Sequence, residues 1–435
     1  MFETSPDEMS PVMPASSGAV QRPQFHFTAS TGWINDPCGI TFRDGKYHVF
    51  YQYIPGVTSW APDCRWGHAS GSSLFTLEEL PVAIAPGDGD KGIWTGSLAI
   101  SDDGSAHAFF TSTADPNIAI GRIRIATPSD EGWIAWHKGD IVASAPPSLE
   151  VTAYRDPFVL KDGACWRMLV GAALADGSAA ALSYSSNDLK SWSYEGIAAQ
   201  RSMHEQDPVW MGSLWECPQI IEHGGHHLLV TSVWDDDVLH YAGYAVGHYA
   251  DGRFDGANWA RLTYGPSYYA PSFFLDANGE PCLTFWMRGV EDQAAGWAGA
   301  HSIPHVLTVH DGLLVATPHP DLDNFHGEPI EDGNLPALAG DVSWLPAETD
   351  ELIIEAAGEA VVTLSVFDSQ VRATTASGAW TMPIADGVRV ILDGPAIEIS
   401  SQSGILGLGV SPRGERYSVR SASGEVSVRP LEMGY

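Results

Sequence analysis

The feature that most constrains the fold is a hairpin signature that recurs five times before residue 330. In each copy, two apolar runs flank an Asp-Gly, Asn-Gly or Gly-Gly pair, and such pairs favour the positive φ angles of two-residue β-hairpin turns. The first turn residues lie 59, 59, 62 and 54 positions apart along the chain, at Asp44, Asp103, Asp162, Gly224 and Asn278. This even spacing indicates five equivalent structural units.

A unit of about sixty residues holds about four strands and their loops, which is the size of a propeller blade. Helical periodicity is nearly absent in this region, and short aromatic and β-branched runs broken by Gly, Asp and Asn are typical of an all-β chain. The sequence therefore predicts a five-bladed β-propeller over residues 25–325. One large β-sandwich is the alternative, but it gives no reason for five evenly spaced hairpins.

The rest of the chain is predicted to form three segments. Residues 1–24 are acidic, rich in Pro and Ser and without an apolar signal sequence, which predicts a disordered tail. A Gly/Pro/Asp-rich stretch over 326–341 predicts a linker, and alternating strands over 342–435 predict a C-terminal β-sandwich. We expect the acidic residues of this last segment to lie on solvated strand faces and to carry no chemistry.

Composition restricts the class of partner. The 435-residue chain has 22 basic and 54 acidic side chains, which gives a formal net charge of −32. Such a field repels nucleic acid and anionic membranes, and no run approaches transmembrane length. We therefore expect a small neutral ligand and no nucleic-acid or membrane partner, while the oligomeric state stays open.

The cysteines indicate the redox compartment. They are odd in number, scattered and without a Cys-x-x-Cys pair, at Cys38, Cys64, Cys165, Cys217 and Cys282. Such a set is neither a disulfide framework nor a zinc site. Reduced thiols in a cytoplasmic protein are the simplest interpretation, although secretion of a processed form stays open.

Acidic residues recur where the predicted hairpins begin. In a propeller, the first strand of each blade lines the central channel. Asp36 lies eight residues before its turn, Asp156 six and Glu216 eight, and Ser97 lies six before the turn of the second unit. Because all four offsets are even, the side chains share one strand face unless bulges intervene. Asp36 alone would read as a turn residue, but three acids in equivalent units predict a site.

Three carboxylates around a Trp-rich pocket fit the cleavage of a glycoside. That reaction uses one carboxylate as nucleophile or base and one carboxylic acid to protonate the departing oxygen, with negative charge near an oxocarbenium-like transition state. A hard-cation site is the alternative, but it uses more oxygen ligands, and the calcium-loop pattern is missing. The sequence therefore predicts a sugar substrate, no metal site and no cofactor.

Six motifs resemble those of glycoside hydrolase family 32, the group of invertases, levanases and inulinases. In chain order they are WINDPCG, YHVFYQYIP, WGHAS, WTGS, YRDP and WECP. Two later segments, GWAGAHSIPHVLTV and RVILDGPAIEIS, resemble the family's propeller-closing segment and its C-terminal signature. The resemblance covers residues 25–405 and implies a five-bladed propeller followed by a β-sandwich.

By this resemblance, Asp36 is the nucleophile that forms a fructosyl-enzyme intermediate, Glu216 the general acid and base, and Asp156 the stabiliser of the transition state. It implies a retaining β-fructofuranosidase for sucrose and short fructo-oligosaccharides, with a fructose subsite at Asn35, Gln52, Trp60, Ser97 and Arg155. A fructosyltransferase with the same triad is the alternative. A non-catalytic sugar-binding propeller and an inverting, arabinan-cleaving propeller fit the motifs less well.

Several positions depart from the family pattern. Cys38 replaces the usual second Asn of the first motif, and we interpret it as a small buried filler. Ser267 replaces an Asp that precedes a Phe-Tyr-Ala segment, and Pro271 follows in the same unit. Ser267 and Pro271 fall where the leaving sugar is expected to bind, so the identity of the leaving sugar and the fructan linkage stay open. The Asp235–Asp237 run is interpreted as a solvated loop at the channel rim.

Overall fold

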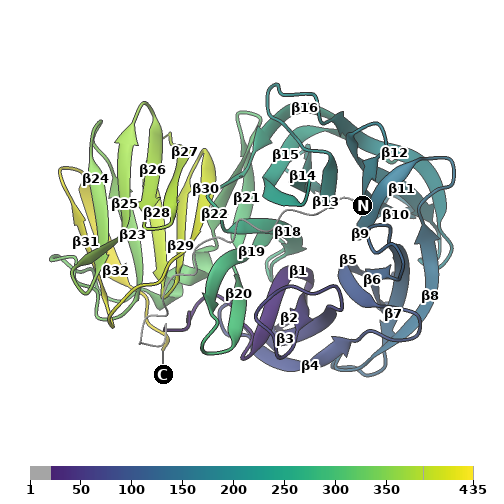
Figure 1. Cartoon of the computed structure of the whole chain (residues 1–435), viewed down its shortest axis with the longest axis horizontal. Coiled ribbons are helices and arrows are strands. Elements are labelled where there is room, and N and C mark those ends of the chain that lie inside the picture. Colours follow the sequence, from purple (N-terminus) through teal and green to yellow (C-terminus); the bar gives the residue numbers. More distant parts are fainter. Residues whose placement is uncertain (1–20, 386, 435) are drawn as a thin grey trace, which may run out of the picture.

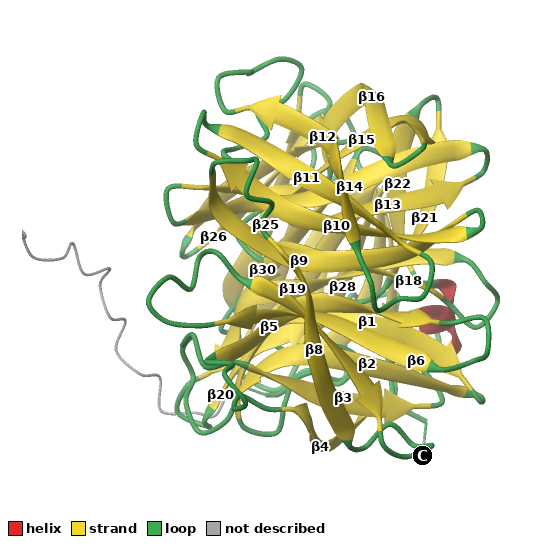
Figure 2. Cartoon of the chain, turned by 90° about the vertical axis from the view of Figure 1, so that its right-hand side faces the viewer, coloured by secondary structure: helices red, strands yellow, loops and turns green. Residues whose placement is uncertain are grey.

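The computed structural model describes residues 21–385 and 387–434, and within these ranges the chain has thirty-two strands and one short 3-10 helix. Sheets arranged around a central axis form a β-propeller, and a two-sheet β-sandwich stands beside it (Figure 1). Seen from the side, the labelled elements are strands, and a single short helix is drawn in red (Figure 2). The predicted all-β class is therefore confirmed. Within the described ranges, no helix has the length and apolar character needed to cross a membrane.

Three propeller units are separate four-stranded antiparallel sheets. Their strands are β5 (Gly92–Ile100), β6 (Ala106–Thr113), β7 (Arg122–Pro128) and β8 (Trp136–Ser144); β9 (Val151–Asp162), β10 (Cys165–Leu174), β11 (Ser178–Ser186) and β12 (Ser193–Ser202); and β13 (Leu214–His223), β14 (His226–Asp235), β15 (Val238–Ala250) and β16 (Arg253–Arg261). Each sheet follows chain order, so its first strand occupies one edge.

The remaining propeller strands share one nine-stranded sheet. They are β1 (Gly32–Arg43), β2 (Lys46–Ile54), β3 (Arg65–Gly71) and β4 (Glu78–Ile84), and then β18 (Tyr268–Leu275), β19 (Pro281–Asp292), β20 (Trp297–His301), β21 (His305–His310) and β22 (Leu313–Pro318). Parallel pairing of β1 with β20 joins Gly32 to Trp297 and Trp33 to Ala298. The ring of the propeller is therefore closed by pairing between its first strand, β1, and β20 near its end.

The predicted hairpins form as β1–β2, β5–β6, β9–β10, β13–β14 and β18–β19. At the first turn, Asp44 and Gly45 have φ of 51° and 77°, as a two-residue hairpin turn requires. The prediction of two-residue turns is wrong at Asp103 and Asn278, where residues 101–105 and 276–280 form longer connections. The first strands of the hairpins lie innermost in the ring (Figure 1). The turn dipeptides therefore located the channel-lining strands correctly.

Those first strands are bulged where they enter the channel. The pairing register shifts between Ile34 and Pro37 in β1, between Glu216 and Gln219 in β13, and at the corresponding place in β5, β9 and β18. A bulge places two residues opposite one and redirects a side chain. Because bulges intervene, the even offsets do not determine which strand face each of the four side chains occupies, and bulge geometry sets their directions.

The sandwich packs two sheets around an apolar core that includes Trp344, Leu352 and Tyr417. One sheet has the order β17 (Thr263–Tyr264), β30 (Gly404–Gly409), β29 (Ala396–Ser401), β28 (Val388–Asp393), β23 (Ala339–Leu345) and β32 (Glu425–Pro430). The other has the order β27 (Gly378–Pro383), β26 (Gln370–Thr375), β25 (Glu359–Phe367), β24 (Glu351–Ala356) and β31 (Tyr417–Ser421). The helix η1 (Pro320–Phe325) precedes the predicted linker, and β23 begins inside it.

Two buried acids of the six-stranded sheet hold the segment that precedes β1. Asp393 accepts hydrogen bonds from the backbone N–H groups of Gln24, Phe25 and His26 at 2.7–3.0 Å. The His26 ring lies between Asp393 Oδ2 at 2.8 Å and Glu398 Oε1 at 3.0 Å. The expectation that acids of this region lie on solvated faces is wrong for these two, because the propeller covers them. Of the predicted tail, residues 1–20 lie outside the described residues.

Candidate active site

Asp36, on β1, is held by three polar side chains. Asn35 Nδ2 donates to its Oδ1 at 3.1 Å, and Gln52 Nε2 and Thr95 Oγ1 donate to its Oδ2 at 3.0 and 2.5 Å. Gln52 also donates to the Thr95 hydroxyl oxygen. Two residues predicted for the sugar subsite, Asn35 and Gln52, therefore fix the direction of the carboxylate.

The ionisation of Asp36 is set by its burial and its neighbours. Burial raises its pKa and the negative charge of Glu216 raises it further, while hydrogen bonds from Thr95, Asn35 and Gln52 lower it, so that the pKa is about 6. The carboxyl group is thus ionised above about pH 6. An ionised, fixed carboxylate in a channel is suited to act as a nucleophile.

Glu216, on β13, has both oxygens engaged. Arg155 Nε donates to Oε1 at 2.8 Å, and the Tyr269 hydroxyl donates to Oε2 at 2.6 Å. Arg155, which the resemblance assigned to the sugar hydroxyls, contacts this acid directly. Tyr269 comes from β18 and was missed in the sequence, because the β18 bulge places it nine residues before its turn, at an odd offset.

Asp156 lies at the β9 bulge with φ of 64°. Its Oδ2 accepts a hydrogen bond from the Cys217 backbone N–H at 3.1 Å, and its own N–H donates to Thr111 Oγ1 at 2.8 Å. Burial and the negative charge of Glu216 raise the pKa of Asp156 above its usual range. Cys217 is the chain neighbour of Glu216, and Thr111, which accepts from the Asp156 N–H, donates to the carbonyl oxygen of Thr95. Thr95 in turn holds Asp36, so the structure brings all three predicted acids together.

Ser97 was predicted to lie in the fructose subsite, but the neighbouring Thr95 is the residue of β5 that contacts Asp36. Ser97 Oγ accepts from the backbone N–H of Val159 at 2.9 Å and lines a cavity of about 40 Å³ in the channel, so it ties β5 to β9. Thr95 contacts Asp36 instead. Thr95 lies eight residues before Asp103, the same offset as Asp36 and Glu216 from their turns, and this signal could have identified it.

Tryptophans surround the acids. Trp60, half exposed, has its ring centroid 5.9 Å from that of Trp94, and the Arg155 guanidinium lies 5.9 Å from Trp94 and 6.0 Å from Trp234. Flat apolar rings beside fixed polar groups suit the faces and hydroxyls of a sugar. Cys38 is fully buried against Phe50 and Trp66, in agreement with its interpretation as a filler.

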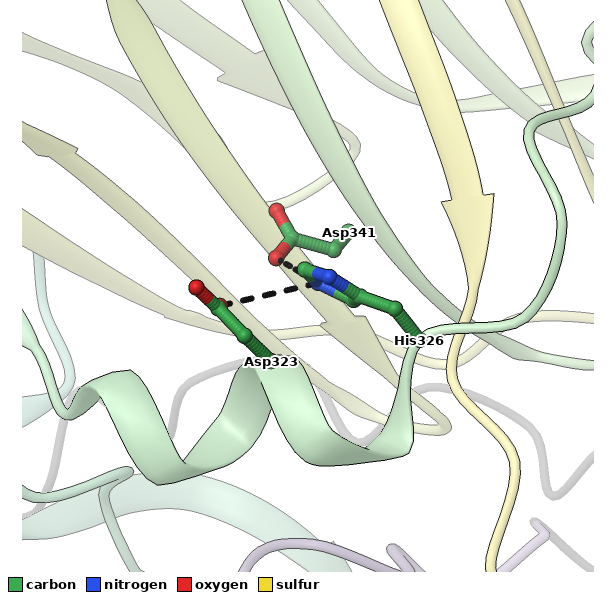
Figure 3. Close-up of side chains that lie close together, drawn as sticks. All are labelled: Asp323, His326 and Asp341. Atoms are coloured by element: carbon green, nitrogen blue, oxygen red, sulfur yellow. Dashed lines mark hydrogen bonds and ion pairs between the residues drawn. The ribbon is translucent and has the colours of Figure 1, made fainter.

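A second group of ligand-type side chains lies between η1 and the sandwich (Figure 3). His326 Nε2 is 2.7 Å from Asp341 Oδ2 and 3.7 Å from Asp323 Oδ1. Arg389 Nη2 lies 2.6 Å from an oxygen of each aspartate, so a fixed positive charge already neutralises the pair. We interpret the group as an ion-pair network that fastens η1 to the six-stranded sheet.

Comparison with known proteins gives matches over most of the chain. The model of the glycosyl hydrolases family 32 N-terminal domain matches residues 26–318. A sucrose-6-phosphate hydrolase of Zymomonas mobilis is 32% identical over 320 residues, which are 68% of this chain and 61% of that protein. A raffinose invertase of Escherichia coli is 28% identical over 328 residues, which are 70% of this chain and 66% of that protein. The match thus spans about three fifths of the first relative's length.

Solved structures share the fold along nearly the whole chain. A β-fructofuranosidase of glycoside hydrolase family 32 from Bombyx mori has a TM-score of 0.82 at 22% identity, with 94% of each chain covered. A sucrose-6-phosphate hydrolase from Lactobacillus gasseri has a TM-score of 0.81 at 20% identity, with 95% of this chain and 93% of that chain covered. The propeller and the sandwich together therefore correspond to one known architecture.

Proposed function

The chain belongs to glycoside hydrolase family 32, and from this premise we propose that it hydrolyses terminal β-D-fructofuranosides such as sucrose and short fructo-oligosaccharides. The observation that carries the proposal is that hydrogen bonds connect Asp36, Asp156 and Glu216, which come from three different strands, through Thr95, Thr111, Cys217 and Arg155. Hydrolysis is favoured over fructosyl transfer because the similar curated proteins reported above are named hydrolase and invertase.

In the proposed mechanism, Asp36 Oδ attacks the anomeric carbon of the fructosyl unit, and the bond to the departing oxygen breaks. Glu216 gives its proton to that oxygen, so the leaving sugar departs as a neutral alcohol. Glu216 then takes a proton from water, whose oxygen attacks the same carbon and releases Asp36. Two inversions give net retention of configuration.

The neighbours of the acids support these roles. Asn35 and Gln52 aim the Asp36 carboxylate, and in this proposal Asp156 accepts hydrogen bonds from the fructosyl hydroxyls as charge develops. Each Glu216 oxygen accepts one protein hydrogen bond and keeps a second lone-pair site, at which a proton can be carried to the glycosidic oxygen. Preorganised polar groups of this kind provide much of the rate enhancement in enzymes.

Replacing Asp36 by Ala tests the nucleophile. We expect sucrose hydrolysis to fall by roughly three orders of magnitude or more, since removing a group that acts as part of a catalytic unit abolishes most of its contribution. The exposed Asp102→Ala variant is the matched control and keeps full activity. Proton NMR of the first product formed by the unaltered protein tests retention, with β-D-fructofuranose appearing before its other anomers. Activity in the folded Asp36→Ala variant would exclude this assignment.

The leaving group has to be inferred from this chain's own residues. One similar protein is named for sucrose-6-phosphate and another for raffinose, so their leaving groups differ in charge and size. The residues on the Glu216 side of the site are those that face the departing sugar, because Glu216 protonates its oxygen.

A further inference from the structure

Strand β30 of the sandwich has one side that faces the propeller (Figure 1). Its Leu406 and Leu408 side chains lie in the apolar core of the sandwich, whereas Ile405 lies in a cluster made mostly of propeller residues. Side chains alternate along a strand, and β30 pairs with β29 without a register shift. Gly407 and Gly409 therefore share the propeller-facing side of β30 with Ile405. A glycine within a strand often marks a place where another backbone comes close.

The start of β18 is connected to this strand by its backbone. Parallel pairing of β17 with β30 joins Tyr264 to Leu406. Three residues later, the backbone N–H of Ser267 donates to the carbonyl oxygen of Gly407 at 3.4 Å. Because Ser267 directly precedes β18, the sandwich fixes the point at which this propeller strand begins.

Gly407 leaves no room for a side chain. A methyl carbon at this position would lie 3.1 Å from three carbon atoms of the Tyr268 ring. That ring is 1% exposed and packs against the rings of Phe285 and His305, whose centroids are 5.1 and 6.0 Å away. Because the enclosed ring has nowhere to move by itself, a larger residue at 407 would displace β18 with it.

Gly409 contacts a bulge of β19 in the same way. The pairing of β19 with β20 shifts between Met287 and Glu291, and Gly289 in this bulge has φ of 74°. A methyl carbon at Gly409 would overlap the carbonyl oxygen of Gly289. The bulge, which also carries Arg288, therefore lies directly against the sandwich backbone.

These two contacts converge on Tyr269. Ser267 accepts a backbone hydrogen bond from Arg288 at 2.9 Å, so the start of β18 and the β19 bulge are joined. The Arg288 guanidinium lies 5.2 Å from the centroid of the Tyr269 ring, and the hydroxyl of that ring donates to Glu216 at 2.6 Å. A displacement of either segment therefore reaches the hydrogen bond to Glu216.

We propose that Gly407 and Gly409, in the sandwich, are positioning residues for the proposed general acid. Their contacts with the start of β18 and with the β19 bulge keep the Tyr269 hydroxyl on Glu216. The inference rests on the proposed function, and it gives the sandwich a part in the reaction besides packing. A small displacement is enough to slow the reaction, because proton transfer requires the acid to lie within hydrogen-bond reach of the departing oxygen.

Gly407→Ala tests the contact with β18. We expect kcat for sucrose to fall about fivefold or more and KM to change by less than about twofold, because the substitution disturbs the acid and leaves the sugar-binding groups in place. Val371→Ala, in β26 of the other sandwich sheet, is the control for stability. It shortens a fully buried core side chain, so it should lower the Tm and, in assays well below that Tm, leave kcat unchanged.

The Tyr269→Phe background supplies a readout that a purely structural role would not change. There the hydrogen bond to Glu216 is already absent, so adding Gly407→Ala should lower kcat by less than about twofold further. Gly409→Ala acts through the β19 bulge and should show the same lack of additivity. Losses that multiply in both double variants would contradict the positioning role.

Crystal structures of Gly407→Ala and Gly409→Ala give a readout that does not require activity. The distance from Tyr269 Oη to Glu216 Oε2 should lengthen beyond about 3 Å, outside the usual range of an O–H···O hydrogen bond. An unchanged distance, or unchanged kcat in both folded variants, overturns the positioning role. An unaltered protein that does not cleave sucrose contradicts the proposed function instead, and the distance then decides the positioning role by itself.

Discussion

The hydroxyl of Tyr269 on β18 donates a 2.6 Å hydrogen bond to Glu216 on β13, so the position of the proposed general acid depends on the neighbouring propeller unit. The guanidinium of Arg288, on β19, lies 5.2 Å from the centroid of the same ring, so the Tyr269 side chain contacts both Glu216 and Arg288. A change at this tyrosine should therefore affect the chemical step more than substrate binding.

Tyr269→Phe should lower kcat about tenfold and change KM by less than about threefold, because it removes one hydrogen bond that orients the acid. Steady-state kinetics with sucrose measures the two constants. Tyr268→Phe is the matched control, since the adjacent tyrosine is buried and interacts with Glu398 instead of Glu216, so removal of its hydroxyl should leave kcat unchanged. Equal losses of kcat in the two variants would contradict a positioning role for Tyr269.

The activity should fall as the pH drops through about 6. The Asp36 carboxyl has a pKa of about 6, and only its ionised form attacks carbon, so the acidic limb of kcat/KM should have its midpoint there. Thr95→Val removes a hydrogen bond that lowers this pKa, so the midpoint should move to higher pH. A pH profile of both proteins measures the shift. A midpoint that stays fixed or moves to lower pH would argue against Thr95 acting on Asp36.

The stability should depend on pH through His26. Burial lowers its pKa, but hydrogen bonds to Asp393 and Glu398 and their charges raise it to about 9, above the ordinary value of 6.5. A raised folded-state pKa stabilises the fold fully below 6.5, and this stabilisation is lost as the pH rises through about 9. It amounts to at most about 3 kcal/mol.

Urea unfolding at pH 6 and pH 10 compares the unaltered protein with His26→Gln. The free energy of unfolding should fall more between these pH values in the unaltered protein than in the variant, which lacks the titrating group. The same pH dependence in both proteins would show that His26 does not couple protonation to folding.

Arg389→Met should lower the free energy of unfolding by about 3 kcal/mol, because it leaves the buried Asp341 without its charge partner. Chelation with EDTA should leave the Tm of the unaltered protein unchanged, since the guanidinium supplies the positive charge between Asp323 and Asp341. A Tm that drops on chelation and recovers with zinc would instead identify this group as a metal site.

The hairpins of the propeller could be predicted from the sequence because a turn depends on the backbone preferences of the few residues that form it. Asp44-Gly45 and Gly224-Gly225 have positive φ at both residues, and the other three pairs have it at the glycine, so each hairpin could be located. Bulges depend on how two strands pair, and this is why Tyr269 escaped detection and Ser97 was preferred to Thr95. The burial of Asp393 and Glu398 was missed for another reason. Alternation along a strand shows that it has two faces but not which face another domain covers.

The pairing of β1 with β20 has a consequence for the order of events during synthesis on the ribosome. Gly32 and Trp33 emerge before most of the propeller, but their partners Trp297 and Ala298 emerge only with its last unit. One edge of β1, the strand of Asp36, therefore stays unpaired until the final propeller unit has been made. The hydrogen bond between the His26 N–H and Asp393 can form only later, when the sandwich has been made. Long-range contacts of this kind slow folding and expose unpaired strands. The proposed nucleophile is thus translated before most of the propeller but fixed in place only when the ring closes.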